Sequence, residues 1–163
     1  MKTVLFSALV IFGAALHAGE VKSSEVTLTP STVSEVKHFE LPSEDGTSQR
    51  LSIITTEDGM STDVYPRYAV YLGYASYAEM GNISTNFSIG RFVEVTSVRQ
   101  KSTGIFEIKA LRITEEGMPR VTLTVDARQV LADEKKLRET CDQDFCDKDL
   151  DSKVTVTEIV DSE

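Results

Sequence analysis

The chain has no tryptophan and very few histidines and cysteines, and this scarcity argues against a zinc site. Two of its 163 residues are histidines and two are cysteines. A structural zinc site of the usual kind needs four cysteine or histidine ligands at short, regular spacings. His38 is the one histidine after residue 17, and no such spacing surrounds it. We therefore expect no zinc centre, and we interpret His38 as a histidine of the strand-like segment EVKHFEL.

The sequence also lacks the familiar catalytic signatures. It contains no G-x-S-x-G elbow, no G-x-G-x-x-G turn and no phosphate-binding loop. Acidic residues occur close together, as in Glu40 and Glu44, but nothing marks a pair of them for acid–base work. We therefore expect that the protein is not an enzyme. A hydrolase with an unrecognised site is kept as an alternative.

Positive charge is in short supply. Lysine and arginine total 17 against 26 acidic residues, which gives a formal net charge of −9. Proteins that bind nucleic acid or anionic membranes present a basic surface that displaces counterions, and this chain has none. We expect no nucleic-acid partner. A protein partner with a basic surface suits the charge better.

Long apolar runs are absent except at the start of the chain. Val4–Leu16 is apolar, follows a lysine and precedes the small residues Ala18 and Gly19. A run of this length is short of the about 20 residues that span a bilayer, and its layout is that of a secretory signal peptide. We predict cleavage after Ala18, which divides the chain into a signal peptide at 1–18, a β-rich domain at 19–139 and an acidic segment at 140–163. The mature chain is expected to be periplasmic or extracellular, without membrane insertion.

Alternating apolar and polar residues dominate the rest of the chain and predict strands. Arg120–Asp126 alternates most clearly, and Phe92–Val98 and Ile105–Ile113 flank a hairpin turn at Lys101–Gly104. These three segments predict an antiparallel meander. Shorter strands are predicted at Val26–Thr29, Glu35–Leu41 and Arg50–Thr56.

The predicted fold class is mainly β. About seven short strands with frequent turn signals indicate an antiparallel sandwich or a small barrel. Asp126–Glu139 is rich in good helix formers and predicts one helix, with Val130, Leu131 and Leu137 on its apolar face. Gly81–Gly90 is rich in glycine, asparagine and serine and is predicted to be a polar loop, in which Asn82 and Asn86 each begin an N-x-[ST] glycosylation motif.

All five tyrosines recur at every third position. They are Tyr65, Tyr68, Tyr71, Tyr74 and Tyr77. Tyrosine and valine favour a strand, in which alternate tyrosines point to opposite faces. Tyrosine also combines an apolar ring with a polar tip and suits interfaces. The run therefore indicates either a face for a protein or carbohydrate ligand, or aromatic residues that fill the core.

An acidic segment near the C-terminus resembles the calcium loop of the EF-hand family. Asp147, Asp149 and Asp151 stand at the first, third and fifth places of a twelve-residue loop, and Glu158 stands at the last. The resemblance implies Ca²⁺ as a cofactor and adds two ligands, the Lys153 backbone carbonyl and Thr155. Calcium prefers six to eight oxygen ligands, which a tight acidic turn can supply.

This segment departs from the family in two ways, and other interpretations stay open. Ser152 replaces the glycine of the sharp turn, and Lys153–Val160 alternates like a strand. The alternatives are a different calcium-binding loop, to which Asp142 and Asp144 could add ligands, and a solvated acidic turn without any metal. Cys141 and Cys146 are predicted to form a disulfide that clamps the preceding loop, because two cysteines in an exported chain usually pair.

The sequence favours an exported protein that binds a macromolecular partner, in the manner of an inhibitor or immunity protein. Its size, predicted export and negative charge support this interpretation. The alternatives are a calcium-dependent cell-surface or carbohydrate-binding module and the hydrolase mentioned above.

Overall fold

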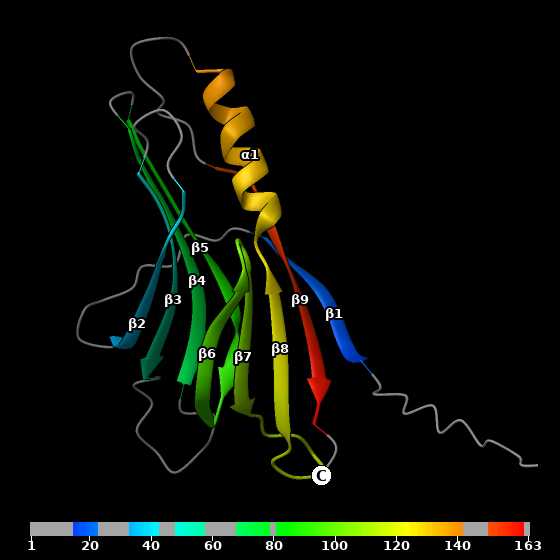
Figure 1. Ribbon diagram of the computed structural model, residues 1–163. Helices are drawn as coiled ribbons and strands as arrows, with labels where there is room; N and C mark the ends of the chain where they lie inside the picture. Colours follow the sequence, from blue (N-terminus) through cyan, green and yellow to red (C-terminus); the bar gives the residue numbers. More distant parts are fainter. Residues whose placement is uncertain are drawn as a thin grey trace, which may run out of the picture.

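The structure is a computed structural model of the whole chain, and it describes residues 15–22, 33–42, 48–57, 68–78, 81–141 and 150–161. Two antiparallel sheets face each other (Figure 1). This arrangement confirms the predicted mainly β fold, and it matches a sandwich. Within the described ranges, no helix is long and apolar enough to cross a membrane.

The smaller sheet has four strands in chain order. It contains β2 (Val33–Glu40), β3 (Ser48–Glu57), β4 (Tyr68–Ala78) and β5 (Gly81–Phe92). Each strand pairs with the next, as expected for consecutive antiparallel strands joined by short connections. The predicted loop at Gly81–Gly90 is therefore wrong, because these residues pair with β4 along the whole of β5.

The larger sheet has five strands in the order β1-β9-β8-β7-β6. These are β1 (Ala15–Lys22), β6 (Glu94–Ser102), β7 (Ile105–Leu111), β8 (Arg120–Asp126) and β9 (Lys153–Val160). β6, β7 and β8 form the predicted meander. Gly104 takes a φ of 73° in the β6–β7 turn, a left-handed conformation that glycine adopts without steric cost.

The chain passes from one sheet to the other at a single residue. Val93 separates β5 from β6, and its backbone N–H donates to the Leu111 carbonyl of the larger sheet at 2.8 Å. Phe92 is fully buried beside this bend. Strands β2 to β8 thus form one continuous meander that turns at Val93.

The N-terminal strand and the C-terminal strand are neighbours. β1 pairs with β9, and β9 also pairs with β8, so residues of the predicted acidic segment 140–163 lie within the larger sheet. Cleavage after Ala18 stays a prediction. It would leave Gly19–Lys22 opposite Val156–Lys153.

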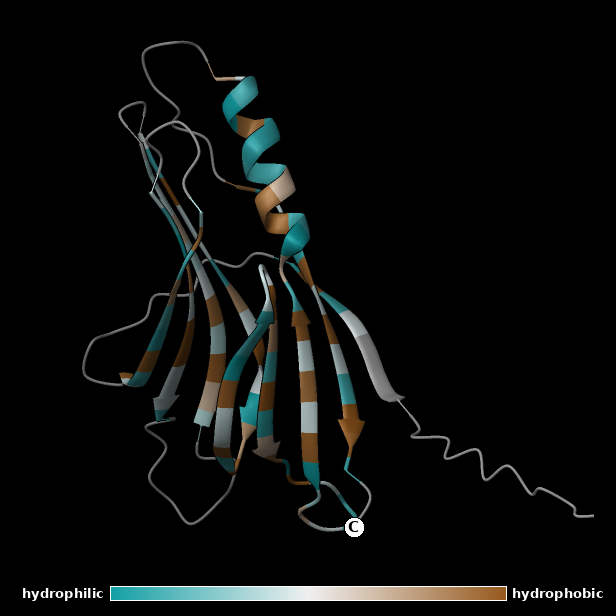
Figure 2. Cartoon of the chain, in the orientation of Figure 1, coloured by the Kyte–Doolittle hydropathy of each residue, from teal (hydrophilic) through white to brown (hydrophobic). Residues whose placement is uncertain are grey.

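The core lies between the sheets because strand alternation directs one row of apolar side chains from each strand inward. Figure 2 shows this alternation along the strands. Leu51, Leu72 and Phe87 from the smaller sheet are fully buried, as are Ile108 and Leu123 from the larger one. The rings of Phe39 and Phe106 join the two sheets with centroids 4.8 Å apart.

Helix α1 (Arg128–Glu139) confirms the predicted helix and follows β8 directly. The Asp126 carboxylate accepts a hydrogen bond from the Arg128 backbone N–H at 3.1 Å, which satisfies one free donor of the first turn. Val130 is fully buried, and Leu131 and Leu137 pack against the core. Figure 1 shows the helix at one end of the sheets.

Candidate functional site: a pocket on the outer face of the smaller sheet

The smaller sheet turns its second face away from the core. On β3, Leu51 and Ile53 point into the core, so Arg50, Ser52 and Ile54 point outward. The register continues this face across the neighbouring strands, since residues directly opposite each other share a face. Ser52 lies opposite His38 on β2 and opposite Gly73 on β4.

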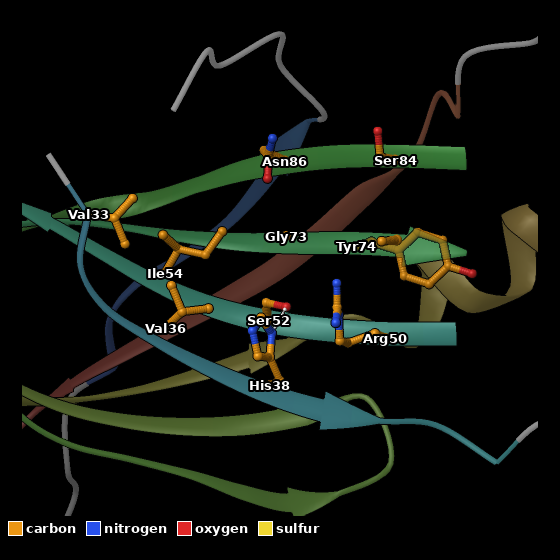
Figure 3. Close-up of a pocket in the computed structure, with 11 residues that line it drawn as sticks. Val33, Val36, His38, Arg50, Ser52, Ile54, Gly73, Tyr74, Ser84 and Asn86 are labelled. Carbon is orange, nitrogen blue, oxygen red and sulfur yellow. Dashed lines mark hydrogen bonds between the residues drawn. The ribbon is translucent and has the colours of Figure 1, made fainter. Parts of the chain in front are cut away.

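A pocket of about 550 Å³ lies on this outer face (Figure 3). All four strands contribute to it. The residues that line it are Val33, Val36, His38, Arg50, Ser52, Ile54, Gly73, Tyr74, Ala75, Ser84 and Asn86. The wall is thus largely apolar, with a few polar side chains, which is the usual composition of a ligand site.

Three cross-strand rows give the pocket a direction. One row holds Val36 and Ile54, the middle row holds His38, Ser52, Gly73 and Asn86, and the third holds Arg50, Ala75 and Ser84. Figure 3 shows the aliphatic side chains at one end of the pocket and Arg50 and Ser84 at the other. Neighbouring rows on one face are two residues apart along a strand, so the two outer rows are four residues apart. At the rise of a β-strand, this corresponds to about 14 Å.

Gly73 makes the hollow in the middle row. A Cβ atom at this position would lie 3.1 Å from Asn86 Oδ1 and 3.2 Å from Ile54 Cδ1, closer than side chains normally pack. Because Gly73 has no side chain, the space above this point of β4 is bordered by the side chains of the neighbouring strands. A glycine inside a strand often marks such a close approach.

The polar side chains of the pocket differ in whether they have a hydrogen-bond partner. His38 Nδ1 and Ser52 Oγ share a hydrogen bond of 2.8 Å. Arg50 Nε is buried and has no hydrogen-bond partner in the part of the chain that the structure describes. No carboxylate lines the pocket among the described residues. Arg50 therefore supplies a positive charge to the pocket in a chain whose net charge is −9.

The tyrosine run does not form one face. β4 confirms the predicted strand, so Tyr71 and Tyr77 share the outer face with Gly73, while Tyr68 and Tyr74 point to the other side. Tyr77 is 46% exposed and Tyr74 only 2%. Tyr65 lies outside the described residues. Tyr71 and Tyr77 thus extend the surface around the pocket, and Tyr74 belongs to the core.

A second polar cluster lies between helix α1 and the smaller sheet, with Glu134 and Ser76 buried at its centre. Glu134 is 1% exposed and accepts hydrogen bonds from Ser76 Oγ at 3.0 Å and Gln49 Nε2 at 2.9 Å. Arg138, one turn later, donates to the same carboxylate and also to Ser76 Oγ. Burial, and then the charge of Glu134, raise the pKa of the Tyr74 hydroxyl far above its ordinary value of 10.0. This cluster fastens the helix to β3 and β4.

Of the residues that line the pocket, sequence reasoning had assigned only Tyr74 to a ligand face, and it missed the central residues of both sites. His38 was expected only as a strand histidine, and Arg50 and Glu134 carried no expectation. The signals were present, since Glu134 follows the buried Val130 by four residues and precedes Leu137 by three, which places it on the apolar face of the helix. To predict the hollow, one would have to know which residues lie beside Gly73, and only the register of the sheet gives this.

Some of the predicted calcium ligands lie outside the described residues, and the others lie just before or within β9. Asp147 and Asp149 lie outside the described residues. Asp151 is exposed, Lys153 and Thr155 are exposed on one face of β9, and Glu158 is buried on the opposite face, 3.1 Å from Arg112 Nη2. The Ser152 hydroxyl donates to Asp133 at 2.7 Å. Calcium binding stays a prediction, with Glu158 already held by an arginine.

The predicted disulfide also stays a prediction. Cys141 packs against the core just after helix α1, and Cys146 lies outside the described residues. In the part of the chain that the structure describes, no group of three or more histidine, cysteine or acidic residues is arranged to hold a metal ion.

Glu107, on the outer face of the larger sheet, allows a prediction about pH. Hydrogen bonds from Arg99 at 2.6 Å and Lys101 at 3.0 Å lower its pKa from 4.5 to about 2. A lowered folded-state pKa adds stability above the unfolded-state pKa, and this stability is lost as the pH falls through the folded-state value. We expect Glu107→Gln to be less stable than the parent protein at neutral pH, with a difference that disappears between pH 4.5 and about 2.

Urea unfolding of both proteins across this pH range measures the difference. Glu115→Gln, in the exposed turn before β8, is the control and should show no comparable change. A stability difference for Glu107→Gln that stays constant down to the acid end would contradict the prediction.

Comparison of the chain with protein-family models, with curated proteins and with solved structures found no match. Function is therefore inferred from the geometry of the pocket and its surroundings.

Proposed function

We propose that the protein is an exported binding protein and that the outer face of the smaller sheet holds a macromolecular partner. The pocket over Gly73 would receive a protruding group of that partner. One observation carries the proposal, namely a hollow of about 550 Å³ with apolar walls and converging polar side chains on an exposed sheet face. Export rests on the signal-peptide pattern at residues 1–18.

The surroundings of the pocket favour a partner larger than a small molecule. Tyr77 and Val36 are 46% and 38% exposed on the same face, which extends the apolar surface beyond the pocket itself. Tyrosine contributes strongly to protein interfaces, where an anchor side chain commonly fills a pocket surrounded by weaker contacts. A hollow of this volume suits such an anchor.

The net charge of −9 acts at longer range than the pocket does. It attracts a partner that is basic overall and speeds the first encounter. Binding is therefore expected to weaken as salt rises, because salt screens charges separated by more than about 10 Å.

Site-specific photocrosslinking in the source organism tests the proposal. A benzoylphenylalanine at Val36, on the rim of the pocket, should give one discrete protein adduct on irradiation. The same residue at Lys109, exposed on the larger sheet, should not. Ala75→Trp should reduce the Val36 adduct, because the indole would occupy the pocket. Equal adducts at both positions, or none at Val36, would overturn the proposal.

A further inference from the structure

We infer that the group entering this pocket is a carboxylate carried by an apolar body, with the carboxylate at Arg50 and the apolar part toward Val36 and Ile54. The inference rests on the proposed function and names the chemistry of the partner's anchor. It follows from the juxtaposition of Arg50 in one row and aliphatic side chains in another row of the same sheet face.

Arg50 is the pocket residue that we expect to bind the anion. Its Nε is buried and lacks a hydrogen-bond partner, and no carboxylate of the described residues forms an ion pair with its guanidinium. A buried donor without a partner is costly, and a charged one more so. Arginine donates to both oxygens of a carboxylate in a planar, paired geometry, so a carboxylate is the ligand that satisfies it best.

The acidic neighbour of Arg50 does not take this role. Glu40 lies directly opposite Arg50 in the β2–β3 register and shares its face, yet no ion pair joins the two. Glu40 is exposed. It therefore leaves the guanidinium available, while its negative charge weakens the attraction for an incoming anion.

The middle row can hold the same carboxylate in place. His38 and Ser52 line the pocket in this row and share a hydrogen bond through His38 Nδ1, whereas Asn86 presents its Oδ1, an acceptor, toward Gly73. Hydroxyl and imidazole groups beside an arginine can donate further hydrogen bonds to an anion. Hydrogen bonds to charged groups are stronger than neutral ones.

The other end of the pocket is suited to the apolar body. Val33, Val36 and Ile54 gather there (Figure 3), and about 14 Å separates this row from that of Arg50. A carboxylate attached to a short chain with a ring or branched end would span this length. In a protein partner, an acidic residue beside an apolar one, or a C-terminal apolar residue, has this chemistry.

A matched pair of small probes tests the inference. 4-Phenylbutyrate and 4-phenylbutan-1-ol share a body and differ in the charge of the head group. Titration of each into ¹⁵N-labelled protein, followed through the amide signals of Gly73 and Asn86, gives the two affinities and locates the binding. We expect the carboxylate to bind about tenfold more tightly at low salt, as one charge-assisted hydrogen bond predicts.

Variants assign this preference to named residues. Arg50→Met should reduce the ratio of the two affinities to about one, and Arg50→Lys should retain part of it. Glu40→Gln should raise the affinity for the carboxylate. Arg120→Met, at an exposed position on the larger sheet, is the control and should leave the ratio unchanged. The same spectra show whether each variant is folded.

The results separate the inference from the proposed function. Equal affinities, no binding of either probe at Gly73 and Asn86, or a ratio unaffected by Arg50→Met would overturn the inference. A Val36 adduct obtained together with equal affinities would leave the proposed function standing with a neutral anchor. A tenfold ratio without the adduct would support the carboxylate site and overturn the macromolecular partner.

Discussion

Glu134→Ala should lower the free energy of unfolding by about 3–5 kcal/mol, the range found when one partner of a buried ion pair is removed. The substitution would leave the hydroxyl of Ser76 and the amide of Gln49 without their acceptor, beside an uncompensated Arg138. Each buried polar group without a partner adds its own cost. Urea unfolding at neutral pH measures the effect.

Two further variants of the same helix serve as comparisons for this result. Glu139→Ala changes an exposed acid of α1 and should alter stability by less than about 0.5 kcal/mol. Glu134→Gln retains an acceptor for Ser76 and should fall between the other two. If Glu134→Ala and Glu139→Ala were equally stable, the buried cluster would not fasten the helix to the sheet.

Phe106→Ala should cost about 3–5 kcal/mol, as expected for a buried phenylalanine. Its side chain is fully buried on β7, and its ring contacts that of Phe39 across the two sheets at 4.8 Å between centroids. The loss comprises the apolar area returned to water and the cavity left between the sheets. Calorimetric or urea unfolding records it.

A matched apolar truncation on the surface is the control. Ile113→Ala, at a position 46% exposed, should change stability by about 0.5 kcal/mol or less. Phe39→Ala should cost less than Phe106→Ala, because Phe39 is only partly buried. A small loss at Phe106 comparable with that at Ile113 would show that the sheets do not depend on this contact.

The meander and the helix were predictable because their local patterns agree with their final environment. Arg120–Asp126 alternates without interruption, and β8 has those bounds. The segment Asp126–Glu139 contains good helix formers, and α1 occupies all but its first two residues. In both segments, intrinsic preference and burial favour the same conformation.

The segment Gly81–Gly90 shows where local composition misleads. Its glycine, asparagine and serine residues favour turns, yet Ile83, Phe87 and Ile89 are buried in β5. Two-residue spacing of apolar residues was present, but the turn-forming residues outweighed it. Pairing with β4 and burial against the core override such a local preference.

Sequence alone determined that apolar and polar residues alternate along the strands and that these strands are antiparallel. It also determined that one helix follows residue 126 and that the net charge is −9. Tertiary structure decided which residues became a site. Alternation assigns Arg50 to one face of β3, but it does not say which residues lie opposite. Hydrogen bonding between strands places Arg50 and Ser52 in rows with Ala75 and Gly73, and only that register produces a hollow with a cation at one end.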